Sequence, residues 1–282
     1  AFARMGMAAS FTLIVNYNHA SFFRERFPEY TLRVLRFLPL ALAYRLTSGR
    51  FKGTKYLKKL GFFRRAVEKG GFDAVWFPYC VDYTFVATRL PALCTVHDIY
   101  PVHRNGTAGW GFITDGRTHL TTVSDYTKND IVRTFALGGA RAESIRKIPN
   151  SVVFDVSAQK PLPALSGKRY ILDLNAYIEK KNPLTLLKAF ALIQKKTDTL
   201  LVFCGGYKDE AVFSRMQAFI AENGLEERVM LLFRVSDEER NWLLTHAALF
   251  VTPSLFEGFG RTPVEAAPIT ALRAECSDST VM

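Results

Sequence analysis

Short apolar runs rich in β-branched and aromatic residues recur along the chain. Most of these runs are unbroken rather than alternating, which is typical of strands that are buried on both faces. We therefore predict strands at residues 11–16, 74–77, 93–97, 120–123, 170–174, 199–204, 229–233 and 248–252.

Helical patterns separate many of these runs. We predict helices at residues 125–136, 183–195, 210–223 and 237–246. Ser124, Asn182 and Ser236 stand where N-cap residues are expected, and Gly224 follows one helix as a C-cap residue does. Alternating strands and helices predict an α/β fold with parallel sheets and helices on both faces.

A boundary between two domains is expected around residues 148–167, where three prolines interrupt any long periodic pattern. We predict an N-terminal domain at residues 1–152 and a C-terminal domain at residues 153–282. Two α/β domains joined in this way would face a cleft, and ligands of such folds bind at the carboxyl ends of the strands.

Positive charge is concentrated in the first half of the chain. The 282 residues carry a formal net charge of +11. Residues 1–150 contain 22 Lys or Arg and 10 Asp or Glu, whereas the remainder contains 15 and 16. Most of the excess lies at residues 22–69, with 13 basic and 3 acidic side chains. Such a region attracts phosphates of nucleotides, anionic lipids or nucleic acids.

Within the basic region, residues 31–46 are mostly apolar, with Arg33, Arg36 and Arg45 spaced along them. We interpret this segment as a helix that Pro39 interrupts. It would lie either in a membrane interface or on the protein surface with its arginines at the edge of an apolar face. An anionic membrane surface is thus one expected partner, through residues 22–69.

The four cysteines are far apart and form no CxxC pair. This spacing argues against a disulfide framework or a zinc site and suits a reducing compartment. The first ten residues lack the pattern of a secretory signal, and no stretch of about 18 residues is apolar enough to span a membrane. We expect a cytoplasmic protein, and the basic region adds peripheral attachment at the inner membrane face as one alternative.

The densest candidate chemistry follows the last predicted strand, in Glu257-Gly-Phe-Gly-Arg-Thr-Pro-Val-Glu265. Glycines let a ligand approach the backbone, and the amides of a helix start suit a phosphate. Thr262 is the expected N-cap, which makes Glu265 the third helical residue. Carboxylates accept hydrogen bonds from sugar hydroxyls, so the motif favours a nucleotide sugar. Alternatively, Thr262 and Glu265 form only a capping box.

This motif resembles the E-x7-E motif of family 4 retaining glycosyltransferases, whose glycosyltransferase-B fold has two Rossmann-like domains facing a cleft. Further blocks resemble that family in the same order along the chain, and the resemblance covers roughly residues 70–267. These blocks are Thr95-Val-His-Asp98, Thr122-Val-Ser-Asp-Tyr-Thr-Lys-Asn-Asp-Ile131, Ile148-Pro-Asn-Ser151, Glu179-Lys-Lys-Asn-Pro183 and Leu201-Val-Phe-Cys-Gly-Gly206.

The resemblance implies a donor site in the C-terminal domain. Glu265 would accept hydrogen bonds from the nucleotide ribose, and Glu257 would contact the donor sugar. The amides of Gly258, Phe259 and Gly260 would lie near the donor phosphates.

The resemblance also assigns residues around the reacting sugar. Lys181 would neutralise the diphosphate leaving group, with Lys180 beside it, because such transferases typically use no metal there. His97 would face the cleft near the sugar, and Asp98 would lie on the acceptor side. The alternative is that His97 and Asp98 form a turn and cap and that the lysines are solvated charges.

The sequence departs from the family pattern in three places. Many members place an arginine five positions before the lysine, where this chain has Ala176, so half of the cationic clamp is missing unless Lys180 replaces it. The glycine-rich loop expected after the first strand is not recognisable. Pro268 breaks the last helix early, so the second domain is expected to be incomplete.

The resemblance implies a metal-independent hexosyltransferase. It would move a sugar such as mannose from a UDP- or GDP-sugar to a lipid-linked or saccharide acceptor in polysaccharide synthesis. A non-catalytic nucleotide-binding relative or fragment is the alternative, favoured by Ala176. Nucleic-acid binding is suggested only by the basic first half. Because the sequence shows no reading helix, stacking platform or zinc ligands, we do not expect a nucleic-acid partner.

Overall fold

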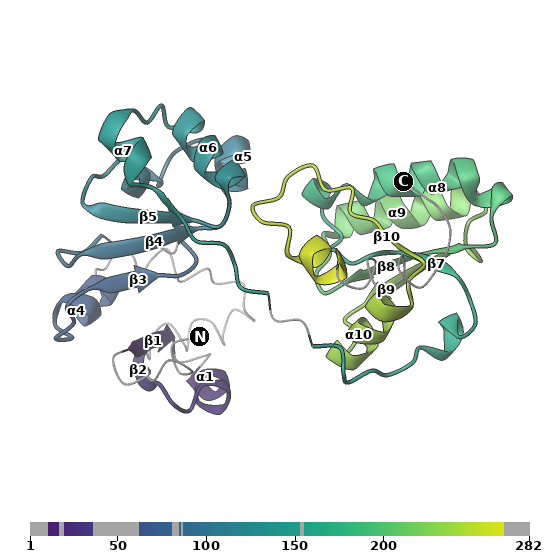
Figure 1. The fold of residues 1–282 in the computed structure, drawn as a ribbon, viewed down its shortest axis with the longest axis horizontal. Helices are drawn as coiled ribbons and strands as arrows, with labels where there is room; N and C mark the ends of the chain where they lie inside the picture. The colour runs from purple at the N-terminus through teal and green to yellow at the C-terminus, as the bar shows by residue number, and fades with distance from the viewer. Residues whose placement is uncertain are drawn as a thin grey trace. The chain divides into compact units, whose positions relative to one another are not determined.

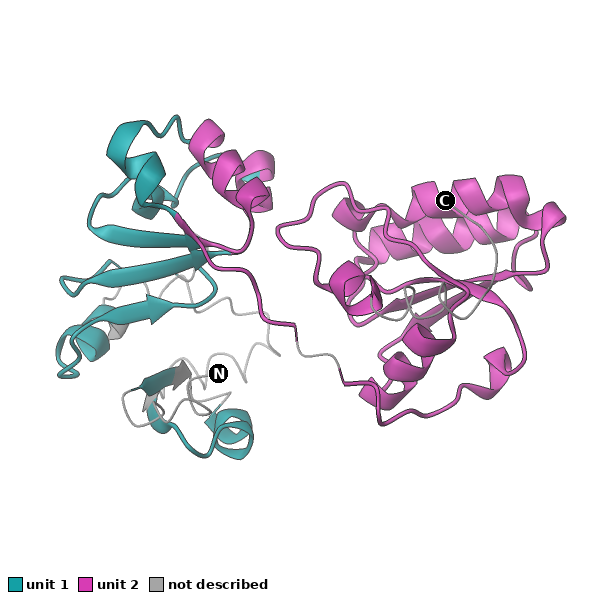
Figure 2. Ribbon diagram, in the orientation of Figure 1, with its two compact units in different colours: residues 1–96, 105–121, 135–145 teal, residues 97–104, 122–134, 146–282 magenta. Residues whose placement is uncertain are grey.

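The computed structural model describes residues 11–16, 20–35, 62–80, 85, 87–152 and 155–267. The chain divides into two compact units (Figure 2). The first contains residues 1–96, 105–121 and 135–145, and the second contains residues 97–104, 122–134 and 146–282. Parallel strands occur in both units, which confirms the predicted α/β class.

The elements up to residue 147 form two small sheets (Figure 1). Strands β1 and β2 pair in parallel, and a four-stranded sheet has the order β3-β4-β5-β6. The elements are β1 (Thr12–Asn16), α1 (Ala20–Arg26), β2 (Thr31–Leu35), α4 (Phe62–Glu68), β3 (Val75–Phe77), β4 (Ala92–Val96), α5 (Tyr100–Asn105), η4 (Gly111–Ile113), β5 (Thr118–Thr122), α6 (Asp125–Thr134), α7 (Gly139–Ser144) and β6 (Arg146–Lys147).

Strand β2 corrects the helix predicted at residues 31–46. Thr31 pairs with Thr12 of β1, and Leu35 pairs with Asn16. The β-branched Thr31 and Val34 favour a strand, and the neighbouring strand supplies the backbone partners that make it stable. Residues 36–46 lie outside the described residues, so the rest of that prediction stays open.

The second unit contains a four-stranded sheet with the order β10-β7-β8-β9, and all neighbouring pairs are parallel. Each of the four strands predicted here is found, with its ends shifted by at most a few residues. The elements are η5 (Pro163–Leu165), β7 (Tyr170–Asp173), η6 (Glu179–Lys181), α8 (Pro183–Ile193), η7 (Gln194–Lys196), β8 (Leu200–Gly205), α9 (Glu210–Glu222), β9 (Val229–Phe233), α10 (Asp237–His246) and β10 (Leu249–Phe250), and residues 261–267 are also helical.

Strand β8 is buried on both faces of this sheet. Leu201 and Phe203 pack with α8 and α9, in a core with Leu187 and Met216. Val202 and Cys204 point to the other face, where they belong to a core with Trp242 and its neighbours on α10. Figure 1 shows α8 and α9 on one side of the sheet and α10 on the other. The unbroken apolar run of β8 follows from this double burial.

The helix starts show which capping predictions hold. Ser236 caps α10 in a full capping box with Glu239. Ser124 accepts a hydrogen bond from the Thr127 amide at 3.0 Å, as an N-cap residue of α6 does. Asn182 is the N-cap residue of α8, as predicted, in the left-handed conformation (φ 55°), but its side chain accepts no hydrogen bond from a helix amide. Its side chain instead donates to the Pro253 carbonyl at 3.2 Å.

One arginine fixes the connection between α8 and β8. Arg228 donates to the carbonyl oxygens of Gln194, Thr197 and Thr199 at 2.9, 2.7 and 3.0 Å. These carbonyls lie in and after η7, where the chain turns back toward the sheet. The guanidinium group therefore satisfies three backbone carbonyls of this turn.

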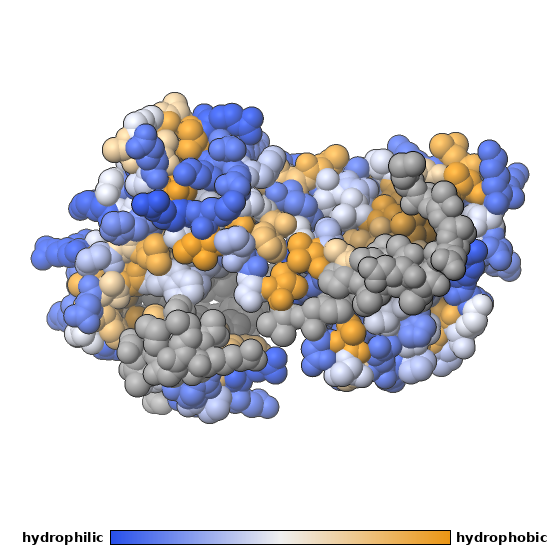
Figure 3. Space-filling view, in the orientation of Figure 1, coloured by the Kyte–Doolittle hydropathy of each residue, from blue (hydrophilic) through white to orange (hydrophobic). Residues whose placement is uncertain are grey.

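Apolar side chains reach the surface at several separate places on the face shown in Figure 3, with hydrophilic residues around them. Leu192 at the end of α8 is 80% exposed. Among the described residues, no helix has the length and apolar character required to cross a bilayer.

We predict that two leucines on α8 differ sharply in their contribution to stability. Leu187 is fully buried between α8, α9 and β8, whereas Leu192 is 80% exposed. Leu187→Ala should lower the free energy of unfolding by about 2–5 kcal/mol, because it leaves a cavity in the core. The matched control Leu192→Ala should change it by less than about 0.5 kcal/mol. Urea unfolding of both variants measures the difference, and equal effects would contradict the packing of α8 described above.

Candidate functional site

The candidate residues follow three strands at their carboxyl ends. His97 and Asp98 come directly after β4, Lys180 and Lys181 lie in η6 after β7, and Glu257 lies in the loop after β10. The contacts described below join residues of the second compact unit.

One cavity of about 400 Å³ gathers most of the predicted site. His97, Asp98, Glu257, Gly258, Phe259 and Gly260 all line it, together with Val123, Asn150, Ser151 and Arg261. All of these residues belong to the second compact unit. Backbone, carboxylate, imidazole and guanidinium groups therefore line one space of a size suited to a small molecule.

Both predicted lysines form ion pairs at this site. Lys181 Nζ pairs with Glu257 Oε1, and their side chains are 15% and 31% exposed. Lys180 Nζ lies 3.3 Å from Asp98 Oδ2 and 5.2 Å from the centre of the Tyr100 ring. The solvated-charge alternative for these lysines is therefore wrong, because each is half-buried against a carboxylate.

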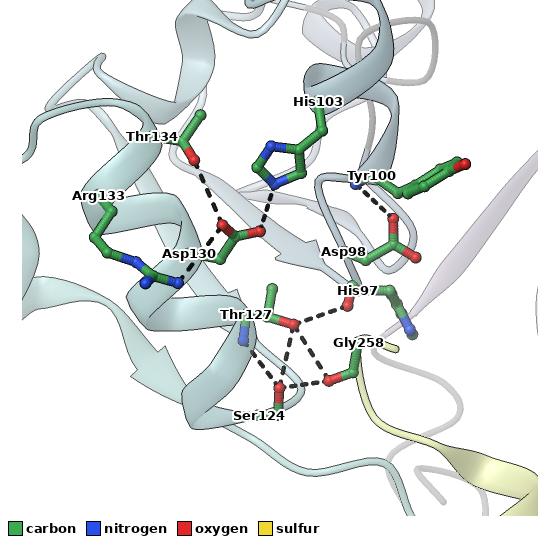
Figure 4. A network of polar contacts seen from close by, with 10 residues as sticks. All are labelled: His97, Asp98, Tyr100, His103, Ser124, Thr127, Asp130, Arg133, Thr134 and Gly258. Atoms are coloured by element: carbon green, nitrogen blue, oxygen red, sulfur yellow. Dashed lines mark hydrogen bonds and ion pairs between the residues drawn. The ribbon is translucent and has the colours of Figure 1, made fainter. Parts of the chain in front are cut away.

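Asp98 combines a local turn with this ion pair. Its Oδ1 accepts a hydrogen bond from the Tyr100 amide at 3.0 Å, and its Oδ2 faces Lys180. The turn-and-cap alternative thus describes one carboxylate oxygen but not the other. Figure 4 shows Asp98 beside Tyr100 at the start of α5.

The Gly258 carbonyl accepts hydrogen bonds from two hydroxyl groups of α6 and its cap (Figure 4). Ser124 Oγ donates to it, and Thr127 Oγ1 lies 3.2 Å from it and 3.1 Å from the His97 carbonyl. A Cβ atom added to Gly258 would lie 1.9 Å from the His97 carbonyl oxygen. The chain therefore requires a glycine here, because the backbone passes too close for any side chain.

An aromatic cluster holds the residue before Glu257. The Phe256 ring lies 5.5 Å from the Tyr100 ring, 5.6 Å from the His103 ring and 5.5 Å from the Tyr126 ring. His103 Nε2 is in turn 2.8 Å from Asp130 Oδ2, on α6. The sequence gives no local signal of this contact, because the two residues are 27 positions apart.

Glu265 is buried and lies between two arginines. Its carboxylate pairs with Arg240, and with Arg261 Nε at 2.9 Å, and the residue is 3% exposed. The helix begins at residue 261, after Gly260 with φ 74°, so Thr262 is not its N-cap and Glu265 is its fifth residue. The capping-box alternative is therefore wrong. Glu265 is not among the residues that line the cavity, but its partner Arg261 is.

A further carboxyl group, Asp173, is buried near Lys181 and Glu257 and senses their charges. It ends β7, is 2% exposed, and accepts a hydrogen bond from the Asn175 amide. Burial raises the pKa of Asp173 to about 7, while the Asn175 bond and the charge of Lys181 act in the opposite direction. Sequence reasoning missed Asp173, although a carboxylate at the end of an apolar strand is a recognisable signal.

Other groups missed from the sequence are Arg240, Arg261 and the hydroxyls of Ser124 and Thr127. Arg261 stands inside the motif and could have been selected, whereas Arg240 lies 25 positions before Glu265. In the described part of the chain, no three His, Cys, Asp or Glu side chains cluster in a way that could hold a metal ion.

Residues 157–269 match the family model for group 1 glycosyl transferases. An alpha-1,3/1,6-mannosyltransferase of Dictyostelium discoideum is 30% identical over 116 residues, which are 36% of this chain and 28% of that protein. O-antigen chain mannosyltransferase B of Escherichia coli is 28% identical over 162 residues, which are 54% of this chain and 41% of the relative. The chain thus spans less than half the length of these two relatives.

The crystal structure of Anabaena HepE in complex with UDP and glucose has the same fold. It superposes with a TM-score of 0.64 at 17% identity, over 95% of this chain and 76% of HepE. This likeness confirms the expected glycosyltransferase-B fold with Rossmann-like domains.

We predict that Asp173 makes stability depend on pH. A carboxyl group whose pKa is raised on folding stabilises the protein fully below the unfolded-state pKa, and this contribution is lost as pH rises through the folded-state pKa. With a folded pKa of about 7, the loss runs from about pH 4 to about pH 7 and amounts to at most about 4 kcal/mol. Asp173→Asn should remove it.

The measurement is urea unfolding of the wild type and Asp173→Asn at several pH values. The difference between their unfolding free energies should change in favour of the variant as pH rises. The exposed Asp198→Asn serves as a matched control and should give a nearly constant difference. A constant difference for Asp173→Asn as well would show that its pKa is not raised.

Proposed function

We propose that this chain transfers a sugar from a nucleotide-sugar donor to an acceptor hydroxyl with retention of anomeric configuration. The match of residues 157–269 to the family model for group 1 glycosyl transferases supports this proposal. The observation that carries the proposal is the cavity in which the Glu257-Gly-Phe-Gly260 backbone, His97 and Asp98 come together, with Lys181 paired to Glu257.

In this proposal the Lys181–Glu257 pair is exchanged when the donor binds. The diphosphate carries negative charge and competes with Glu257 for Lys181. Once Lys181 turns to the phosphates, the Glu257 carboxylate is available to accept hydrogen bonds from sugar hydroxyls. The ion pair thus compensates both charges until the diphosphate binds Lys181 and the sugar hydroxyls bind Glu257.

The leaving diphosphate needs positive charge and amide donors that are already in place. Lys181 supplies the first cation from its place beside Glu257, and Glu257 lines the cavity together with Gly258, Phe259 and Gly260. Ala176 removes one cation of the usual clamp, and Lys180 is engaged with Asp98. Arg261 also lines the cavity, with a side chain that is 70% exposed, so we assign it the second cationic role.

We place His97 next to the reacting sugar, Asp98 on the acceptor side, and Glu265 behind the donor ribose. Glu265 would accept ribose hydroxyls through the oxygen lone pairs that Arg240 and Arg261 leave available, since a carboxylate offers about four acceptor positions.

The donor and acceptor classes follow from the relatives. Both curated relatives carry the name mannosyltransferase, and one acts on an O-antigen chain by its name. We therefore propose mannose as the sugar, from GDP-mannose or a UDP-sugar, and a saccharide or lipid-linked acceptor in polysaccharide synthesis. The basic residues 22–69 would bind an anionic membrane surface at the inner face.

We predict that the wild-type chain binds UDP or GDP and that Lys181→Ala weakens this binding about ten- to a hundredfold, because a charged hydrogen bond to the diphosphate is lost. Lys188→Ala on the exposed side of α8 is the matched control and should leave the affinity unchanged. Calorimetric titration of each protein with UDP and with GDP measures the affinities and identifies the base. Equal affinities of the Lys181 and Lys188 variants would remove Lys181 from the site.

Turnover separates an enzyme from a non-catalytic relative. We expect the wild type to release UDP or GDP from the matching nucleotide sugar when a mannosyl acceptor is present, with and without a metal chelator. NMR of the product should show the α-anomer that the α-linked donor contains. Nucleotide binding without any transfer would favour the non-catalytic alternative, and a full loss of activity with chelator would contradict metal independence.

A further inference from the structure

A buried carboxyl group, Asp173, lies near the candidate site but does not line its cavity. Asp173 ends β7 and is 2% exposed, and Asn175 is 7% exposed. An aspartate is rarely this buried without a partner that compensates its polar atoms. Its partner is Asn175, whose side-chain amide donates to Asp173 Oδ1.

The same amide connects Asp173 to the loop that carries Glu257. Asn175 Nδ2 lies 3.2 Å from Thr252 Oγ1, which is in turn 3.2 Å from Ser254 Oγ. The loop is also attached to the segment that carries Lys181, because the Leu255 amide donates to the Lys180 carbonyl at 2.8 Å. Hydrogen bonds therefore connect Asp173 to the start of the loop that carries Glu257, and this loop is bonded to the backbone next to Lys181.

Four titratable groups influence Asp173 or are influenced by it. Lys181 favours its ionised form and Glu257 disfavours it. Cys204 on β8 and Tyr177 after β7 also sense its charge, but burial raises the pKa of the Cys204 thiol to about 12 and raises that of Tyr177 as well. These two side chains stay neutral near pH 7, so the charge balance involves Asp173, Lys181 and Glu257.

We propose that Asp173 is a positioning residue for Lys181. Its protonation state determines how strongly Lys181 interacts with the diphosphate of a nucleotide sugar. This inference rests on the proposed function. When Asp173 is neutral, Lys181 is shared between Glu257 and the ligand. When Asp173 releases its proton to solvent, a second carboxylate competes for Lys181 and repels the diphosphate.

Because Asp173 is buried, its charge acts strongly on Lys181. A charge in the interior is weakly screened, so its interaction with Lys181 persists at ordinary salt concentrations. The raised pKa of Asp173, about 7, places the change near neutral pH. Donor affinity should therefore fall as the pH rises through this range.

The test compares donor binding by the wild type, Asp173→Asn and Asp198→Asn between about pH 6 and about pH 8. The probes are UDP-glucose and GDP-mannose, because the charge of their diphosphate diesters does not change over this range. We expect the wild-type affinity to fall about five- to tenfold. Asp173→Asn resembles the protonated form and should stay constant, while the exposed Asp198→Asn should behave like the wild type.

A second measurement uses the wild type alone and does not depend on how the variant folds. If ionised Asp173 weakens donor binding, then donor binding must raise the pKa of Asp173 by linkage. Calorimetry near pH 7 in buffers with different ionisation enthalpies should then show proton uptake on binding, by up to about one proton per donor. Asp173→Asn should show no such uptake.

The outcomes separate this inference from the proposed function. Binding with the same pH dependence in the wild type and Asp173→Asn, or binding without proton uptake, overturns the role of Asp173 and leaves the transferase proposal standing. A folded wild type that binds neither probe at any pH overturns the proposed donor site, and the inference with it.

Discussion

Burial of the central strand β8 on both faces is the constraint on which the second unit depends. Leu201 and Phe203 face one core and Val202 and Cys204 face the other, so neither face of the strand can carry polar chemistry. Polar side chains are excluded from the body of the sheet and gather where the strands end. Asp173, Lys181 and Glu257 all stand at or after the carboxyl end of a strand for this reason.

The charged residues that gather there compensate one another. Lys181 with Glu257, Lys180 with Asp98, and Glu265 with two arginines each combine groups that would be costly to bury alone. A ligand that carries negative phosphates and neutral hydroxyls offers a replacement partner to both signs of charge. The proposed nucleotide-sugar donor has both features.

Much of the second unit could be predicted from sequence, because its signals are local. The apolar runs of β7, β8 and β9 and the capping box at Ser236 follow from neighbouring residues alone. Predictions failed where distant segments decide the outcome. Residues 31–35 form a strand because β1 pairs with them, and an apolar sequence with spaced arginines does not reveal that partner.

The site shows the same division between local and distant information. The loop of Glu257 and its glycines was identified from the motif, and these residues line the cavity described above. The surroundings of Glu265 were not predicted, since Gly260 allows the helix to begin at residue 261 and Arg240 comes from another helix. Residue identity thus selected the loop, but only the fold revealed which charges meet.

Arg228 has a consequence for how the second unit comes apart. Its guanidinium group holds three carbonyls of the turn between α8 and β8. If α8 separated from the sheet, the three carbonyls and the Arg228 guanidinium group would lose their hydrogen-bond partners together. Partial opening at this end is therefore disfavoured, and amide hydrogen exchange in α8, β8 and the start of β9 should proceed through one cooperative event.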